Sequence, residues 1–168
     1  MVKPNKESEP REALVAHFRE QDETLRRQWL RQVRTTGAVE NLIRQGVEAI
    51  NRRDADSFVA LASPDVEWED SIFWSEGVRT YRGRAELREW FKRVFVEPWE
   101  SLLMEVTEIT EADDRVLTGS ILTARGKDSG VETVLRFWQV VWLADGKATR
   151  RQIFLERAEA LEAAGMAE

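Results

Sequence analysis

The spacing of hydrophobic residues changes from helical to strand-like near the middle of the chain. In the first half, apolar residues recur every three to four positions between charged ones, as they do on one buried face of a helix. Residues 66–70 interrupt this pattern, because Val-Glu-Trp-Glu-Asp places its apolar residues two positions apart, as in a half-buried strand. The helices predicted from the spacing are residues 9–35, 38–52, 54–62 and 84–96.

The second half of the chain has the composition of antiparallel strands joined by short turns. Asp145-Gly146, which separates two of the β-rich runs, is the clearest hairpin signal. Helix-forming sequence returns at residues 157–164 and ends at Gly165. The predicted long strands are residues 99–110, 115–125, 131–143 and 147–155. This order predicts an α+β fold in which three helices pack on one face of a curved antiparallel sheet and enclose a pocket.

Length and composition favour one domain with an N-terminal extension. A chain of 168 residues with 42% hydrophobic content can bury one substantial core. Gly37, which follows two threonines, is expected to end the first helix. The predicted parts are a helical extension at residues 1–36, the domain at residues 37–165 and a tail at residues 166–168.

Charge and residue types exclude several classes of function. The net charge of −6 and the pI of about 5.1 argue against binding to nucleic acid or to an anionic membrane surface. No run of about 18 apolar residues predicts a membrane span, so a soluble cytoplasmic protein is expected. The chain has no cysteine, and its one histidine, His17, is expected on the surface of the extension. No phosphate loop, dinucleotide fingerprint or zinc-ligand spacing occurs, so neither a cofactor nor a metal is expected.

Four short segments resemble a known family. Their sequences are Val-Glu-Ala-Ile-Asn-Arg-Arg-Asp-Ala-Asp-Ser-Phe at 47–58, Pro-Asp-Val-Glu-Trp-Glu-Asp at 64–70, Tyr-Arg-Gly-Arg-Ala-Glu-Leu at 81–87 and Ala-Asp-Gly-Lys at 144–147. In this order they resemble the SnoaL-like branch of the NTF2-like superfamily, and the match extends over about residues 39–165. The resemblance implies a cone-shaped α+β barrel with an apolar cavity, often dimeric through the outer face of the sheet.

The resemblance also suggests positions for catalytic residues. Asp70 falls where ketosteroid isomerases carry the aspartate that transfers a proton. The two donors that those enzymes aim at the enolate oxygen are missing, because Gly46 and Gln139 stand at their positions. Gln139 also occupies the position of the histidine of SnoaL-type polyketide cyclases. The Arg-x-Asp element of limonene-epoxide hydrolases is absent from residues 117–122.

Asp70 has two possible roles on the sequence alone. Strand alternation places Val66, Trp68 and Asp70 on one face. If that face is buried, a carboxylate among Trp68, Trp74 and Trp90 would have a raised pKa and could act as a general base. In the other interpretation, Asp70 accepts hydrogen bonds from loop amides or pairs with an arginine.

Two further polar residues of the predicted pocket also have two interpretations each. Arg151 could point inward and neutralise Asp70, which would make an anion or carbonyl site, or it could be solvated. Gln139 could orient a ligand carbonyl or hydroxyl, or it could be a structural amide. The residues predicted to line the pocket are Trp68, Trp74, Tyr81, Trp90, Phe91, Phe137, Gln139, Arg151 and Ile153.

The opposite face of the sheet predicts a homodimer. Trp138, Val140 and Trp142 alternate away from Gln139, and together they would form an apolar patch on a monomer. The expected function is binding of a small apolar molecule in the cone. An isomerase, cyclase or dehydratase reaction that uses Asp70 and no cofactor could accompany binding. The alternative is a non-catalytic ligand-binding or dimerisation module.

Overall fold

The computed structural model describes residues 37–73 and 77–166. Its helices are α2 (Gly37–Arg52), α3 (Ala55–Val59), α4 (Gly83–Phe91), the π-helix η1 (Lys92–Val96) and α5 (Arg157–Ala164). Its strands are β1 (Ala62–Asp70), β2 (Arg79–Arg82), β3 (Trp99–Ala112), β4 (Arg115–Gly126), β5 (Glu132–Ala144) and β6 (Lys147–Phe154). The predicted helix at 9–35, His17 and Trp74 lie outside the described residues.

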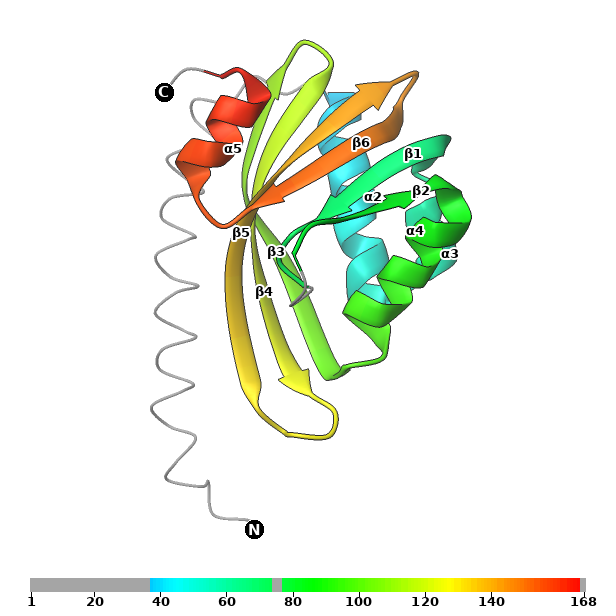
Figure 1. Ribbon diagram of the computed structural model, residues 1–168, viewed down its shortest axis with the longest axis vertical. Helices are drawn as coiled ribbons and strands as arrows, with labels where there is room; N and C mark the ends of the chain where they lie inside the picture. Colours follow the sequence, from blue (N-terminus) through cyan, green and yellow to red (C-terminus); the bar gives the residue numbers. More distant parts are fainter. Residues whose placement is uncertain (1–36, 74–76, 167–168) are drawn as a thin grey trace.

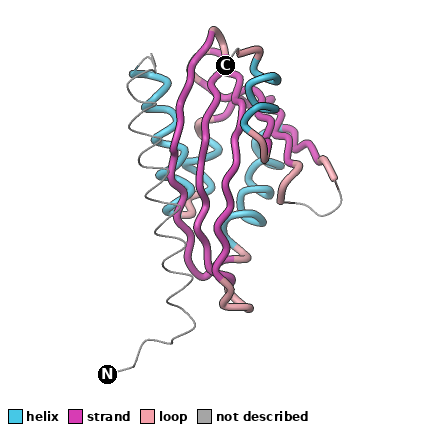
Figure 2. Tube along the Cα trace, turned by 90° about the vertical axis from the view of Figure 1, so that its left-hand side faces the viewer, coloured by secondary structure: helices cyan, strands magenta, loops and turns pink. Residues whose placement is uncertain are grey.

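The described strands form one curved, unclosed sheet with helices on both faces, so the predicted α+β class is confirmed. The strand order is β2-β1-β6-β5-β4-β3, and every neighbouring pair is antiparallel except β1 and β6, which run parallel. Helices α2, α3 and α4 lie on the inner face, and α5 lies on the outer face (Figure 1). Figure 2 shows β3, β4 and β5 running side by side along most of the molecule.

Most of the predicted elements are found with small shifts at their ends, but the region around β1 differs. Strand β1 begins at Ala62, whereas residues 54–62 are predicted to be helix and the strand to start at Val66. Its pairing with β6 is irregular between Ala62 and Glu67. Proline is tolerated at such irregularities, so Pro64 does not prevent the earlier start. The strand β2 lies between the run at 66–70 and the helix predicted at 84–96, where no element is predicted, because four residues are too few to show a period.

Local side-chain chemistry explains two of the boundaries. The Asp54 carboxylate accepts hydrogen bonds from the Ser57 amide (3.1 Å) and hydroxyl (2.6 Å), and so caps α3 as predicted. The same hydrogen bonds lower the pKa of Asp54. Between β5 and β6, Asp145 and Gly146 both have positive φ, of 51° and 74°, which is the requirement of a tight hairpin turn. Gly37, expected to end a preceding helix, is the first residue of α2.

The two faces of the sheet have separate apolar clusters. The larger cluster fills the space between the inner face and helices α2, α3 and α4. On the outer face, α5 packs through Leu161 against Leu117 and Val140, with Trp138 and Trp142 at the margin. The apolar patch that suggested a homodimer is therefore covered in part by the chain's own α5, and the homodimer stays a prediction. No helix among the described residues is long and apolar enough to cross a membrane.

Candidate functional site

A cavity lies between the inner face of the sheet and the helices that cover it. The centre of a water molecule can move through about 80 Å³ of its interior, whereas one bound water needs about 10–15 Å³. Helix α2 lines it with Leu42, Ile43, Val47 and Ile50, and the strands contribute mainly apolar side chains. Its polar side chains, apart from the tryptophan indoles, are Ser120, Gln139 and Arg151. This is space for a small molecule with a few placed polar groups, the usual composition of a ligand site.

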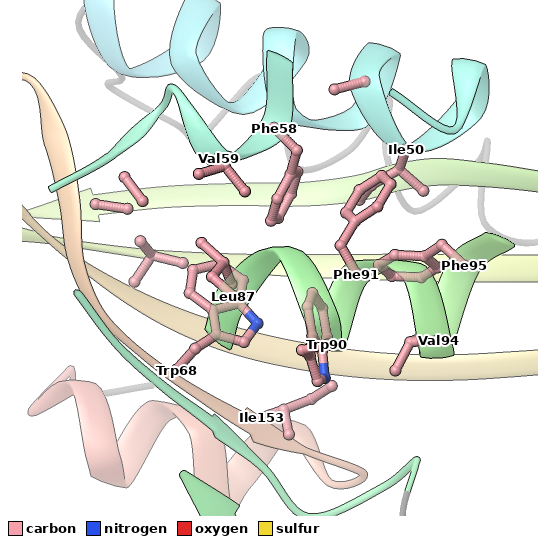
Figure 3. Packing of buried hydrophobic residues seen from close by; sticks show 14 of the residues in the cluster. Ile50, Phe58, Val59, Trp68, Leu87, Trp90, Phe91, Val94, Phe95 and Ile153 are labelled. Atoms are coloured by element: carbon pink, nitrogen blue, oxygen red, sulfur yellow. The ribbon is translucent and has the colours of Figure 1, made fainter. Parts of the chain in front are cut away.

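Aromatic rings form one wall of the cavity. Trp68 of β1 lies with its ring centroid 5.6 Å from that of Phe58 and 5.5 Å from that of Trp90, and Trp90 lies 5.3 Å from Phe95. Figure 3 shows these side chains converging from a helix on one side and from the sheet and α4 on the other. Because the rings pack edge-on or tilted against one another, they hold the wall in shape.

Gly46 opens the cavity on the α2 side. A glycine inside a helix costs about 1 kcal/mol relative to alanine, so its presence there needs a reason. A Cβ built on Gly46 would meet only Leu61 Cδ1, at 3.8 Å. The missing side chain is therefore matched by free space next to residues that line the cavity. The resemblance to ketosteroid isomerases places one of their two donors at Gly46, and this position does border the cavity but carries no side-chain donor.

Arg151 is the charged residue of the cavity wall and is buried (2% exposed). Its Nε donates to Gln139 Oε1 at 3.0 Å and its Nη1 donates to the Glu69 carbonyl at 2.7 Å. The guanidinium lies over the rings of Trp68 (4.9 Å) and Trp90 (5.1 Å). The pairing of β1 with β6 places Trp68 opposite Arg151, which explains the contact. The inward orientation considered from the sequence is the one found.

Burial lowers the pKa of Arg151 to about 10, and the charges of Asp70 and Glu69 act in the opposite direction. Near neutral pH the guanidinium therefore remains a cation. Its contacts use neutral acceptors and aromatic faces, and no carboxylate forms an ion pair with it among the described residues. A buried cation without a bonded anion is costly, and cation–π contacts offset only part of that cost.

Asp70 is buried but its carboxylate is occupied. Oδ1 accepts hydrogen bonds from the amides of Ile72 (3.0 Å) and Phe73 (3.1 Å), and Oδ2 accepts one from Trp90 Nε1 (2.7 Å). Asp70 is not among the residues that line the cavity. The interpretation in which Asp70 binds loop amides is the one that these contacts support. Its visible effect is to fix the start of the loop after β1 and the orientation of Trp90.

The cavity contains about half of the residues predicted to line it. Trp68, Trp90, Phe137, Gln139 and Arg151 do so. Tyr81, Phe91 and Ile153 are buried in the surrounding core without lining the cavity, and Trp74 lies outside the described residues.

Sequence reasoning missed the contributions of α2 and of Ser120. The apolar face of α2 is recognisable from its spacing, but the spacing does not say that the face borders a cavity. Ser120 gave no signal, because every residue from Val116 to Leu122 on β4 is buried and the alternation of a one-sided strand is lost. Among the described residues, no group of three acidic or histidine side chains is placed to hold a metal ion.

Comparisons with known proteins agree with this architecture. Residues 43–151 match the model of the SnoaL-like domain. An NTF2-like protein of unknown function from Burkholderia pseudomallei is 21% identical, with a TM-score of 0.62 over 76% of this chain and 97% of that one. A protein with a ketosteroid isomerase-like fold from Catenulispora acidiphila, solved with trimethylamine, is 16% identical, with a TM-score of 0.62 over 79% and 96%.

A third solved structure is TerC, co-crystallised with polyporic acid. It is 23% identical, with a TM-score of 0.60 over 76% of this chain and 99% of that one. The search of curated proteins found no match. At these identities the solved structures show the shared fold alone, whereas the family model covers most of the described sheet and the helices of its inner face. The chain therefore belongs to the SnoaL-like domain family.

Proposed function

We propose that this protein binds a small, mainly apolar molecule in the cavity between its sheet and helices. The observation that carries the proposal is the cavity itself, with its aliphatic wall from α2, its aromatic wall around Trp68 and Trp90, and the space beside Gly46. A ligand of the right shape in this apolar cavity gains both burial of its apolar surface and contact with the walls.

The fold by itself does not name the ligand. One structure of this fold holds trimethylamine and another was crystallised with polyporic acid, so related scaffolds accept chemically different small molecules. Both examples support a small-molecule ligand here. The chemical class has to come from this chain's own residues.

A reaction that uses Asp70 is the second candidate. Its basis is a buried carboxylate beside an aromatic wall. To act as a base, Asp70 would have to release Trp90 or the two loop amides and reach the cavity that it does not line. The contacts favour binding without catalysis by Asp70. If binding does lead to turnover of the ligand, unchanged turnover in Asp70→Asn removes this residue from the mechanism.

The first experiment is native mass spectrometry of the purified protein, followed by organic extraction of any retained molecule. The matched variant is Gly46→Leu, which fills the cavity from α2, and its control is Gln45→Leu, which adds the same side chain at an exposed neighbouring position. We expect a retained small molecule in the wild type and in Gln45→Leu, and its loss in Gly46→Leu. Retention in folded Gly46→Leu would contradict binding in this cavity. The same spectra report whether the protein is a dimer.

A further inference from the structure

We infer that the ligand carries an anionic oxygen, such as a carboxylate or a phenolate, which is held by Arg151, Gln139 and Ser120. This deepens the proposed function and rests on it. The inference comes from the polar atoms that the cavity wall leaves without partners. Among the described residues that line the cavity, these are N–H groups of Arg151 and Gln139 and the Ser120 hydroxyl, which can donate or accept.

Arg151 and Gln139 hydrogen-bond to each other, and each has N–H groups that this hydrogen bond does not use. Because Gln139 Oε1 accepts from Arg151 Nε, the amide oxygen is occupied and the amide nitrogen is the atom left to bind. Among the described residues, neither Gln139 Nε2 nor Arg151 Nη2 has a hydrogen-bond acceptor. Each of these two nitrogens carries two N–H groups.

Ser120 adds a donor on one side of this pair, and Trp68 on the other side has an indole N–H that surrounding atoms cover. Trp68 is 6% exposed, and its buried Nε1 has no partner among the described residues. The Ser120 hydroxyl, on a residue 2% exposed, likewise has no hydrogen bond within the part of the chain that the structure describes. Neighbouring strands bring the four residues to one face, with Trp68 opposite Arg151 across β1 and β6 and Ser120 opposite Phe137, two residues from Gln139.

The charge of the wall favours an anion over a neutral group. Arg151 is the buried cation, and the carboxylates that act on it are Asp70 and Glu69. The carboxylate oxygens of Asp70 accept hydrogen bonds from Trp90 and two backbone amides. The Glu69 carboxylate accepts one from Gln152 at 3.4 Å. Their negative charge reduces the field of Arg151, but neither carboxylate oxygen satisfies its remaining N–H groups.

The number of donors exceeds what a single carbonyl can accept. A carbonyl oxygen has two lone pairs, whereas a carboxylate has about four acceptor sites and matches the fork of a guanidinium. An apolar cation or a ligand rich in donors would leave these N–H groups unpaired and would face a like charge. The structure thus fits an amphipathic ligand with its apolar body against α2 and its oxyanion at Arg151.

The experiment compares 4-ethylbenzoate with 4-ethylbenzamide by isothermal titration calorimetry at pH 7.5, because the two probes have nearly the same shape and differ in charge. The wild type should bind the benzoate at least about tenfold more tightly, as expected for hydrogen bonds to a charged group. Arg151→Gln should abolish this preference. Arg150→Gln, which removes an exposed arginine stacked on Trp142 of the other face, should keep it.

Each outcome has a distinct meaning. Equal binding of both probes to the wild type, with loss of both in Gly46→Leu, would keep the proposed function and overturn the anionic ligand. Tighter binding of the amide would overturn it as well. No binding of either probe would count against the cavity as a binding site, and the inference would fall with it. The wild-type comparison decides the matter even if Arg151→Gln does not fold, and circular dichroism identifies that case.

Discussion

Each face of the sheet holds a buried charged side chain beside tryptophan, Glu108 on the outer face and Arg151 on the inner face, but only Glu108 is paired with an opposite charge. On the outer face, Arg157 of α5 makes three hydrogen bonds of 2.9–3.2 Å to the carboxylate of Glu108, which is 6% exposed, and Trp138 Nε1 donates to the same carboxylate at 3.3 Å. On the inner face, Arg151 contacts a carbonyl, an amide and two indole rings.

The difference separates a structural site from the proposed binding site. A buried charge with a complete set of partners fixes one element against another, as Glu108 fixes α5 to the sheet. Donors without an acceptor at the wall of an apolar cavity are costly, and a ligand that accepts from them removes that cost. We therefore expect substitutions on the outer face to change mainly stability and substitutions of Arg151 on the inner face to change ligand binding, and four predictions test this expectation.

The largest expected effect is on stability, through the outer face. Glu108→Ala should lower the free energy of unfolding by about 2–3 kcal/mol, because it leaves Arg157 and the Trp138 indole without their shared acceptor. Urea denaturation measures the loss. The exposed pair of Glu100 with Arg125 is the control, since Glu100→Ala should change stability by no more than about 0.5 kcal/mol. Equal effects of the two variants would contradict the structural role of the outer face.

Alanine substitutions of two glycines, Gly119 in β4 and Gly46 in α2, should change stability in opposite directions. A Cβ on Gly119 would lie 2.9 Å from Thr107 Oγ1 and 3.0 Å from Trp138 Nε1, so Gly119→Ala should destabilise by about 1–3 kcal/mol. Gly46→Ala has room and improves helix propensity, so it should stabilise by about 0.5–1 kcal/mol. Thermal denaturation of both variants gives the signs. Destabilisation by Gly46→Ala would mean that the cavity side of α2 is already full.

Asp70→Asn tests whether the hydrogen bonds of the buried carboxylate stabilise the fold. We expect a loss of about 1–2 kcal/mol of stability, because an amide cannot accept from Trp90 Nε1 and from both loop amides at once. Chemical denaturation measures it, with the exposed Asp65→Asn on the same strand as control. The variant should still bind 4-ethylbenzoate. Unchanged stability would show that these hydrogen bonds contribute nothing.

The pH dependence of binding tests the charge of Arg151. The pKa of this arginine is lowered by burial to about 10, so its proton is lost as the pH rises through that value. Benzoate stays ionised throughout, and the anion favours the charged arginine. Its affinity should therefore fall by up to about tenfold between pH 8 and pH 11, while that of the neutral benzamide stays level. Calorimetry at both pH values gives the comparison, and parallel losses for both probes would point to unfolding instead.

The sequence predicts some helices and strands of this protein better than others. Hydrophobic spacing was sufficient for α2, α4 and the long strands, because a regular element with one buried face repeats its pattern over several turns or residue pairs. The same alternation placed Val66, Trp68 and Asp70 together on one face of β1, and the structure shows that this face is the buried one. It failed for the four-residue β2, where tertiary pairing with β1 decides the conformation.

At the candidate site, too, local spacing along the sequence predicts less than the tertiary contacts decide. The sequence by itself grouped Val66, Trp68 and Asp70 on one face of β1 and separated Gln139 from Trp138 and Trp142 on β5, but it left open whether Arg151 points inward. Only the tertiary structure decided that Arg151 bonds Gln139, that Asp70 is occupied by Trp90, and that α5 covers part of the outer tryptophans. The physical reason is that burial follows a local period along the chain. Pairing between polar atoms instead depends on strand order and register, which join residues far apart in sequence.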